Sequence, residues 1–127
     1  MMNNNVSFCG YNPTKLFGDL SAGDIAEAYR LAYRKAGEAV GLKYVPNHKL
    51  TGEQLKRMNP TDVFDARTNK LTEKGRKGFD HINKDLGVSS KSKTSEVVEA
   101  IKNKLVAIFY DEGDGRATAS RSFGYFG

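Results

Sequence analysis

The pattern of apolar and polar positions predicts one long amphipathic helix over residues 21–41. Ser21 is a suitable N-cap, and Gly41 suits the left-handed turn that ends many helices. Between them, apolar side chains recur at spacings of three and four and so share one helix face. They are Ile25, Tyr29, Ala32, Ala36 and Val40. We expect this face to pack against a hydrophobic core.

A second long helix is predicted to begin at Thr94 and to continue to Phe109. Its apolar residues form a wide face, as expected for a helix that is buried on one side. They are Val97, Val98, Ile101, Leu105, Ile108 and Phe109. Beyond Tyr110 the composition changes to glycine, serine and acidic residues, so we expect the helical domain to end there.

Shorter helical elements are predicted in the middle of the chain. Thr51 and Gln54 have the spacing of a capping box, and the helix that they begin has to end before Pro60. A further turn that starts at Pro60 is expected to bury Val63 and Phe64. Before these elements, residues 42–50 form a connector or one short strand.

The segment after residue 71 is predicted to form one helix that starts behind Thr72 as N-cap and stops at Gly87. Its apolar residues lie at helical spacing. They are Phe79, Ile82 and Leu86. Glycine weakens a helix by up to about 1 kcal/mol relative to alanine, so the first turn, which contains Gly75, depends on tertiary contacts.

Together these elements predict a mainly α protein, a small single-domain bundle of about four helices, with the option of short terminal strands. A chain of 127 residues is long enough for one core and too short for a second one to be expected. We divide it into an N-terminal arm or short strand (1–20), a helical domain (21–110) and a C-terminal arm rich in glycine, serine and aromatic residues (111–127).

The positive charge of the chain is concentrated in one segment. The formal net charge is +5, and residues 66–104 hold 10 Lys and Arg against 5 Asp and Glu, whereas the flanking segments are nearly balanced. A localised basic segment attracts anions and is typical of proteins that bind nucleic acids. Solvation of ordinary helix faces by lysine is the alternative explanation.

The first functional hypothesis is therefore a small basic protein, not an enzyme, that binds the phosphate backbone of DNA or RNA. Phosphate contacts attract and position a protein without reading the base sequence. The candidate contacts include the helix start at Thr94, whose backbone N–H groups favour anions. The full set is Lys70, Lys74, Arg76, Lys77, Lys91, Lys93 and Thr94.

Part of this segment resembles a known DNA-binding module. Residues 86–105 combine the sequence Leu-Gly-Val, a polar turn, and Glu96 followed by two valines. This arrangement resembles the second half of a helix-extended-helix module of the SAP type, and the resemblance implies that the turn grips DNA. Two positions depart from that pattern, because the lysine before the second helix is displaced to Lys93 and Ile82 is offset by one residue.

The second functional hypothesis is a protein that binds a protein partner, as an assembly or inhibitor protein, through its aromatic ends. The chain ends in SRSFGYFG, and aromatic rings on an arm provide a large contact area. The partner would be an acidic protein surface or a second copy of the chain. The candidate residues are Arg121, Phe123, Tyr125 and Phe126.

Several other classes of function are not expected from the sequence. The two histidines and the single cysteine, Cys9, lack the spacing of a zinc site, and the acidic turn after Tyr110 lacks the ligands of an EF-hand, so we predict no metal and no cofactor. No nucleophile or phosphate-loop motif is present. No segment has the length and apolarity of a membrane span, and one cysteine fits a reducing compartment, so we expect a cytoplasmic protein.

Overall fold

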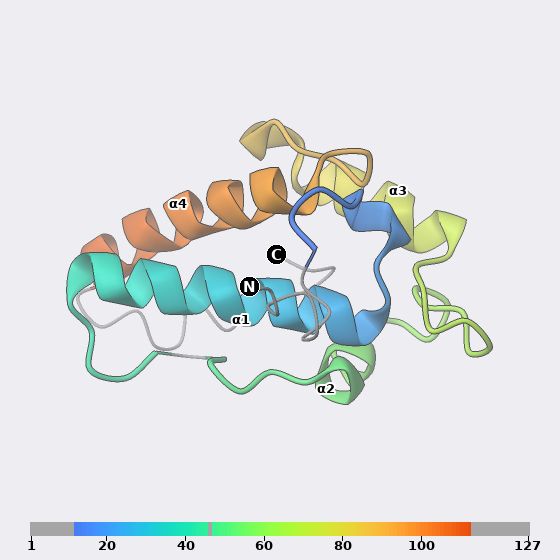
Figure 1. Ribbon diagram of the computed structural model, residues 1–127, viewed down its shortest axis with the longest axis horizontal. Helices are drawn as coiled ribbons and strands as arrows, with labels where there is room; N and C mark the ends of the chain where they lie inside the picture. The colour runs from blue at the N-terminus through green and yellow to red at the C-terminus, as the bar shows by residue number, and fades with distance from the viewer. Residues whose placement is uncertain (1–11, 46, 113–127) are drawn as a thin grey trace, which may run out of the picture.

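The computed structural model describes residues 12–45 and 47–112, which form a mainly helical, single-domain bundle (Figure 1). Its α-helices are α1 (Ala22–Val40), α2 (Gly52–Arg57), α3 (Glu73–Ile82) and α4 (Thr94–Glu112), with short 3-10 helices η2 (Phe17–Asp19) and η3 (Lys84–Leu86). Within the described residues there are isolated β-bridges and no strand. The predicted fold class is therefore confirmed, while the optional terminal strands lie outside the described residues.

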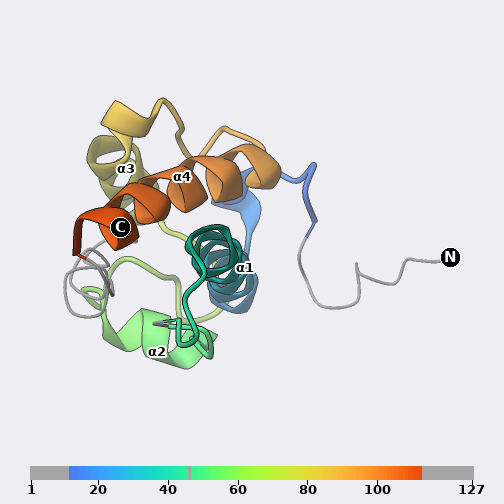
Figure 2. The same cartoon turned by 90° about the vertical axis from the view of Figure 1, so that its left-hand side faces the viewer.

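Helix α1 is the central element of the bundle. It lies between α2 on one side and α4 on the other (Figures 1 and 2). Helices α1 and α4 run in the same general direction and cross obliquely, and the rings of Tyr33 and Phe109 meet with centroids 6.4 Å apart. Five alanines of α1 are buried, and their small side chains let neighbouring elements approach the helix closely. They are Ala22, Ala26, Ala28, Ala32 and Ala36.

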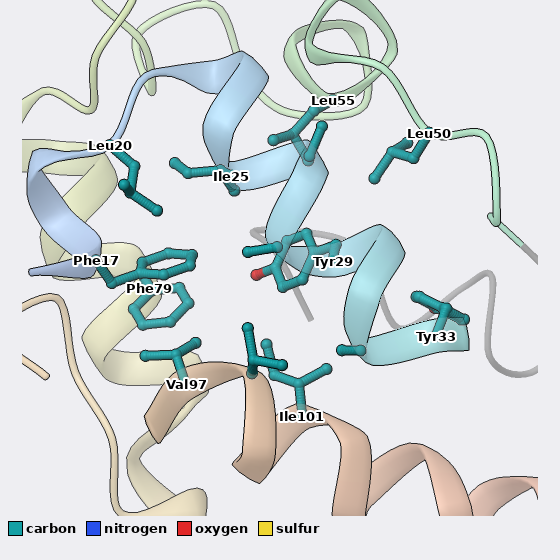
Figure 3. Close-up of a cluster of buried hydrophobic side chains, with 14 of the residues drawn as sticks. Phe17, Leu20, Ile25, Tyr29, Tyr33, Leu50, Leu55, Phe79, Val97 and Ile101 are labelled. Carbon is teal, nitrogen blue, oxygen red and sulfur yellow. The ribbon is translucent and has the colours of Figure 1, made fainter. Parts of the chain in front are cut away.

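An aromatic cluster joins the N-terminal segment to two helices. The ring of Phe17 stacks on that of Phe79 with centroids 4.5 Å apart and lies 6.2 Å from that of Tyr29 (Figure 3). All three side chains are fully buried, and burial raises the pKa of the Tyr29 hydroxyl well above its usual value. Phe17, Gly18 and Leu20, which belong to the segment expected from the sequence to be an N-terminal arm or short strand, are therefore buried against the helices.

The helix ends form as their capping residues predict. The Ser21 hydroxyl accepts a hydrogen bond from the Asp24 N–H at 3.3 Å, and Gly41 adopts a left-handed conformation with φ 76°. Thr51 begins α2 with a complete capping box. Thr72 begins α3, where its hydroxyl accepts the Gly75 N–H at 3.1 Å.

Helix α3 is shorter than predicted. It ends at Ile82 and is followed by η3, so the expected continuous helix to Gly87 is wrong. The physical reason lies at Asn83, whose side-chain amide donates to the Phe79 carbonyl at 3.0 Å. The backbone N–H of Asn83 donates to the same carbonyl, and such side-chain bonds compete with helix propagation.

The segments between the helices are connectors. Residues 42–45 and 47–50 contain no strand, and Asn47 has a positive φ of 59°. The turn at Pro60 closes with a hydrogen bond from the Val63 N–H to the Pro60 carbonyl at 3.1 Å. Val63 and Phe64 are both buried, as predicted.

The start of α3 is so close to the preceding loop that it requires glycine at position 75. A Cβ atom there would lie 2.4 Å from the Val63 carbonyl oxygen, whereas at Gly23, on the exposed side of α1, the nearest atom would be 3.9 Å away. We predict that Gly75→Ala lowers the free energy of unfolding by about 1–3 kcal/mol through overpacking. Gly23→Ala should instead raise it by about 0.5–1 kcal/mol because alanine favours helix.

Urea unfolding of the two variants beside the unchanged chain measures both effects. Equal stability of the two alanine variants would contradict the close contact between α3 and the Val63 carbonyl.

Candidate nucleic-acid interface

The N-terminal segment docks against the loop that precedes α4, residues 87–93. The Gly18 N–H donates to the Ser90 carbonyl at 2.8 Å, and Leu16 forms an antiparallel bridge with Lys93. Figure 1 shows η2 beside α3 and the start of α4. Residues that are more than 70 positions apart in the sequence thus lie side by side.

Hydrogen bonds within the loop fix its shape. The Asp80 carboxylate of α3 accepts the Ser90 N–H at 2.7 Å, and the Ser92 hydroxyl accepts the Ser89 N–H at 3.0 Å. The Glu96 carboxylate accepts the Lys93 N–H at 3.3 Å, in the manner of a cap. The loop is therefore held from α3 on one side and from α4 on the other.

The side chain of Arg76, on α3, extends to the point where the N-terminal segment meets the loop. A Cβ atom on Gly18 would lie 3.2 Å from Cδ of Arg76, so this side chain passes next to the docked segment. The guanidinium donates to the Leu71 carbonyl at 2.8 Å, which uses one of its five N–H donors. The side chain is exposed, and its remaining donors are available to a ligand.

Four cationic residues are carried by the segments that meet at this docking point, and we call them the junction cluster. All are exposed, and within residues 12–45 and 47–110 none of them belongs to an ion pair. They are Lys15, Arg76, Lys91 and Lys93. Three of these were predicted from the sequence. Lys15 was missed because it lies in a nearly neutral segment, and only the pairing of residues 15–18 with the loop places it there.

Thr94 does not offer a phosphate site. It is fully buried, its hydroxyl donates to the Lys15 carbonyl at 2.7 Å, and its N–H donates to the same oxygen at 2.9 Å. The next N–H, of Ser95, donates to the Pro13 carbonyl at 3.0 Å. The predicted phosphate cradle at the start of α4 is thus filled by the protein's own backbone.

The other predicted lysines are not brought to the junction. Lys74 pairs with Asp62 at 2.7 Å, and its hydrogen bond lowers the pKa of that carboxyl. Lys77 pairs with Glu73 at 3.5 Å. Lys70 forms a β-bridge with Ser21 at the start of α1.

The residues of the proposed C-terminal arm, Arg121, Phe123, Tyr125 and Phe126, lie outside the described residues, as does Cys9. In the part of the chain that is described, no group of three His, Cys, Asp or Glu residues is placed to hold a metal ion. No helix found there is both long enough and apolar enough to cross a membrane.

Comparison with protein-family models, with curated proteins and with solved structures finds no match to this chain. The resemblance of residues 86–105 to a helix-extended-helix module therefore rests on those residues alone.

The buried bond of Thr94 yields a stability prediction. We expect Thr94→Val to lower the free energy of unfolding by about 0.5–1.5 kcal/mol, because it deletes a buried hydrogen bond and keeps the side-chain shape. Thr61→Val, at an exposed threonine, is the matched control and should change stability by less than about 0.5 kcal/mol. Thermal unfolding followed by circular dichroism measures the difference, and equal stability of the two variants would argue against a structural role for Thr94.

Proposed function

We propose that this protein binds nucleic acid through the phosphate backbone and that the junction cluster is the contact surface. The observation that supports the proposal most directly is the meeting of three separate segments that together carry four exposed cations. Within the described residues none of the four is neutralised by an ion pair. An unpaired cation can approach a phosphate without first losing a protein partner.

The chemistry of the cluster fits phosphate oxygens. Arginine and lysine supply most of the phosphate contacts in protein complexes with nucleic acids, and arginine offers a planar fork of donors. The bond from Arg76 to the Leu71 carbonyl restricts the side chain before a ligand arrives. Restriction in advance lowers the entropic cost of binding.

The remaining predicted lysines are proposed to act through long-range attraction instead of direct phosphate contacts. Lys74 and Lys77 are already paired with carboxylates, so a direct phosphate contact would compete with an existing ion pair. Together with Lys70 they add to the positive field that attracts a polyanion over longer distance. Replacing a lysine of the junction cluster should therefore lower the affinity for nucleic acid more than replacing Lys74 or Lys77.

Salt dependence of binding tests the proposal. For a DNA duplex, four phosphate contacts predict a slope of about −3 to −4 in a plot of log affinity against log salt concentration, since each contact contributes about −0.9. In Lys91→Gln/Lys93→Gln the slope should become less steep by about 2. Fluorescence anisotropy with labelled duplex DNA and duplex RNA provides the measurement and compares the two nucleic acids.

The control is Lys35→Gln/Lys102→Gln, which removes the same charge from α1 and α4. Lys102 already pairs with Glu99 at 2.9 Å. This control variant should keep the slope of the unchanged chain. The proposal fails if neither nucleic acid binds, or if the two double variants lose affinity and slope equally.

A further inference from the structure

Two adjoining hollows surround Tyr44 on one side of α1. This side carries α2 and the connector between α1 and α2, described over residues 42–45 and 47–50. One, of about 480 Å³, lies between the connector and α2, and the other, of about 230 Å³, lies between the connector and α1. Tyr44 and His48 line both. We call the two hollows together the Tyr44 groove, and its larger part falls within the size range of about 300–1,000 Å³ that is usual for small-molecule sites.

The groove presents an exposed aromatic ring. Tyr44 has 67% of its surface accessible, and the ring of His48 meets it edge to face with centroids 5.6 Å apart. His48 is itself held by a 2.9 Å hydrogen bond between Nδ1 and the Val45 carbonyl. Met58, 41% exposed, lines the same hollow. A supported ring beside an exposed thioether is a surface on which a flat apolar group can stack.

Only cations, and no carboxylates, are found among the charged residues that line the groove. Lys49 and Arg57 line the larger hollow, and Arg34 and Lys43 line the smaller one. In residues 12–45 and 47–110, none of these four takes part in an ion pair. A separate hollow of about 440 Å³ near Phe64 differs, since Glu53 and Asp65 line it. The charge of the Tyr44 groove therefore favours an anion with more than one negative charge.

Amide groups complete the set of contacts. Gln54 and Asn47 line the larger hollow. The Gln54 Oε1 accepts the Thr51 N–H at 2.9 Å, so Gln54 offers its Nε2 donors to a ligand. The side-chain Nδ2 of Asn47 is buried and has no hydrogen-bond partner among the described residues. A buried donor without a partner is costly unless a ligand or water satisfies it. Side-chain amides can pair with the donors and acceptors on the edge of a heterocyclic base.

From these contacts we propose that the Tyr44 groove binds a nucleoside phosphate. The base stacks on Tyr44, the amides of Asn47 and Gln54 face its edge, and Lys49 and Arg57 hold the phosphate. A free nucleotide and the 5′-phosphorylated end of a single strand share this chemistry. The connector and α2, which line the groove, lie on the opposite side of α1 from α3 and the start of α4 (Figure 1). This site is therefore separate from the proposed backbone contact.

Titration with adenosine monophosphate, followed by amide chemical shifts of the full chain, tests the proposal. We expect saturable shifts confined to the connector and α2. Base stacking on an aromatic ring predicts that Tyr44→Ala weakens the affinity about tenfold or more. Tyr44→Phe keeps the ring and should bind as the unchanged chain does. Arg57→Gln should weaken binding of the nucleotide and leave any binding of adenosine unchanged.

Three results would overturn the proposal: no saturable shift with the nucleotide, equal shifts with inorganic phosphate alone, or unchanged affinity in Tyr44→Ala. Competition by a 5′-phosphorylated single strand would assign the site to strand ends as well, and its absence would assign the site to free nucleotides. Lys91→Gln/Lys93→Gln should bind the nucleotide normally, so failure of the backbone proposal and failure of this one are distinguishable.

Discussion

The packing of Phe17 between α1 and α3 is the contact on which the rest of this structure depends. Its ring stacks on Phe79 and lies against Tyr29, so one side chain joins the N-terminal segment to two helices. A fully buried phenylalanine contributes about 3–5 kcal/mol relative to alanine. That is a large share of the stability of a domain of this size. With Phe17 in place, the neighbouring backbone meets the loop before α4.

Two consequences follow from this docking. The carbonyls of Pro13 and Lys15 accept the first N–H groups of α4, so the helix start is satisfied by distant backbone instead of by a phosphate. The same contact places the backbone of Lys15 beside the loop that holds Lys91 and Lys93. The contact that satisfies the start of α4 is thus the same contact that places the N-terminal segment beside the cationic loop. Gly18 permits this contact because it has no side chain.

The helices were predictable because their signals are local. Apolar spacing and the caps at Ser21, Thr51 and Thr72 act over three or four residues and need no knowledge of the fold. The break at Asn83 was missed because it depends on a side-chain bond that competes with a helix pattern that otherwise continues. Phe17 was missed because a single aromatic residue outside any periodic pattern does not show whether it is buried.

The candidate sites were less predictable than the helices. Charge counted along the sequence identified Arg76, Lys91 and Lys93, yet their association with Lys15 depends on long-range pairing. The Tyr44 groove was missed entirely, because its cations lie in a segment with little net charge and come together only where the connector meets α1 and α2. Charge totals over a segment do not show which cations remain without ion pairs.

Amide hydrogen exchange of the intact chain tests the docked N-terminal segment most directly. We expect the N–H groups of Gly18 and Thr94 to exchange as slowly as those in the middle of α1. We also expect Phe17→Ala to remove the protection of both amides together, before α1 loses its own. Exchange of Gly18 and Thr94 at the rate of an unstructured peptide, with α1 fully protected, would contradict the docking of the N-terminal segment.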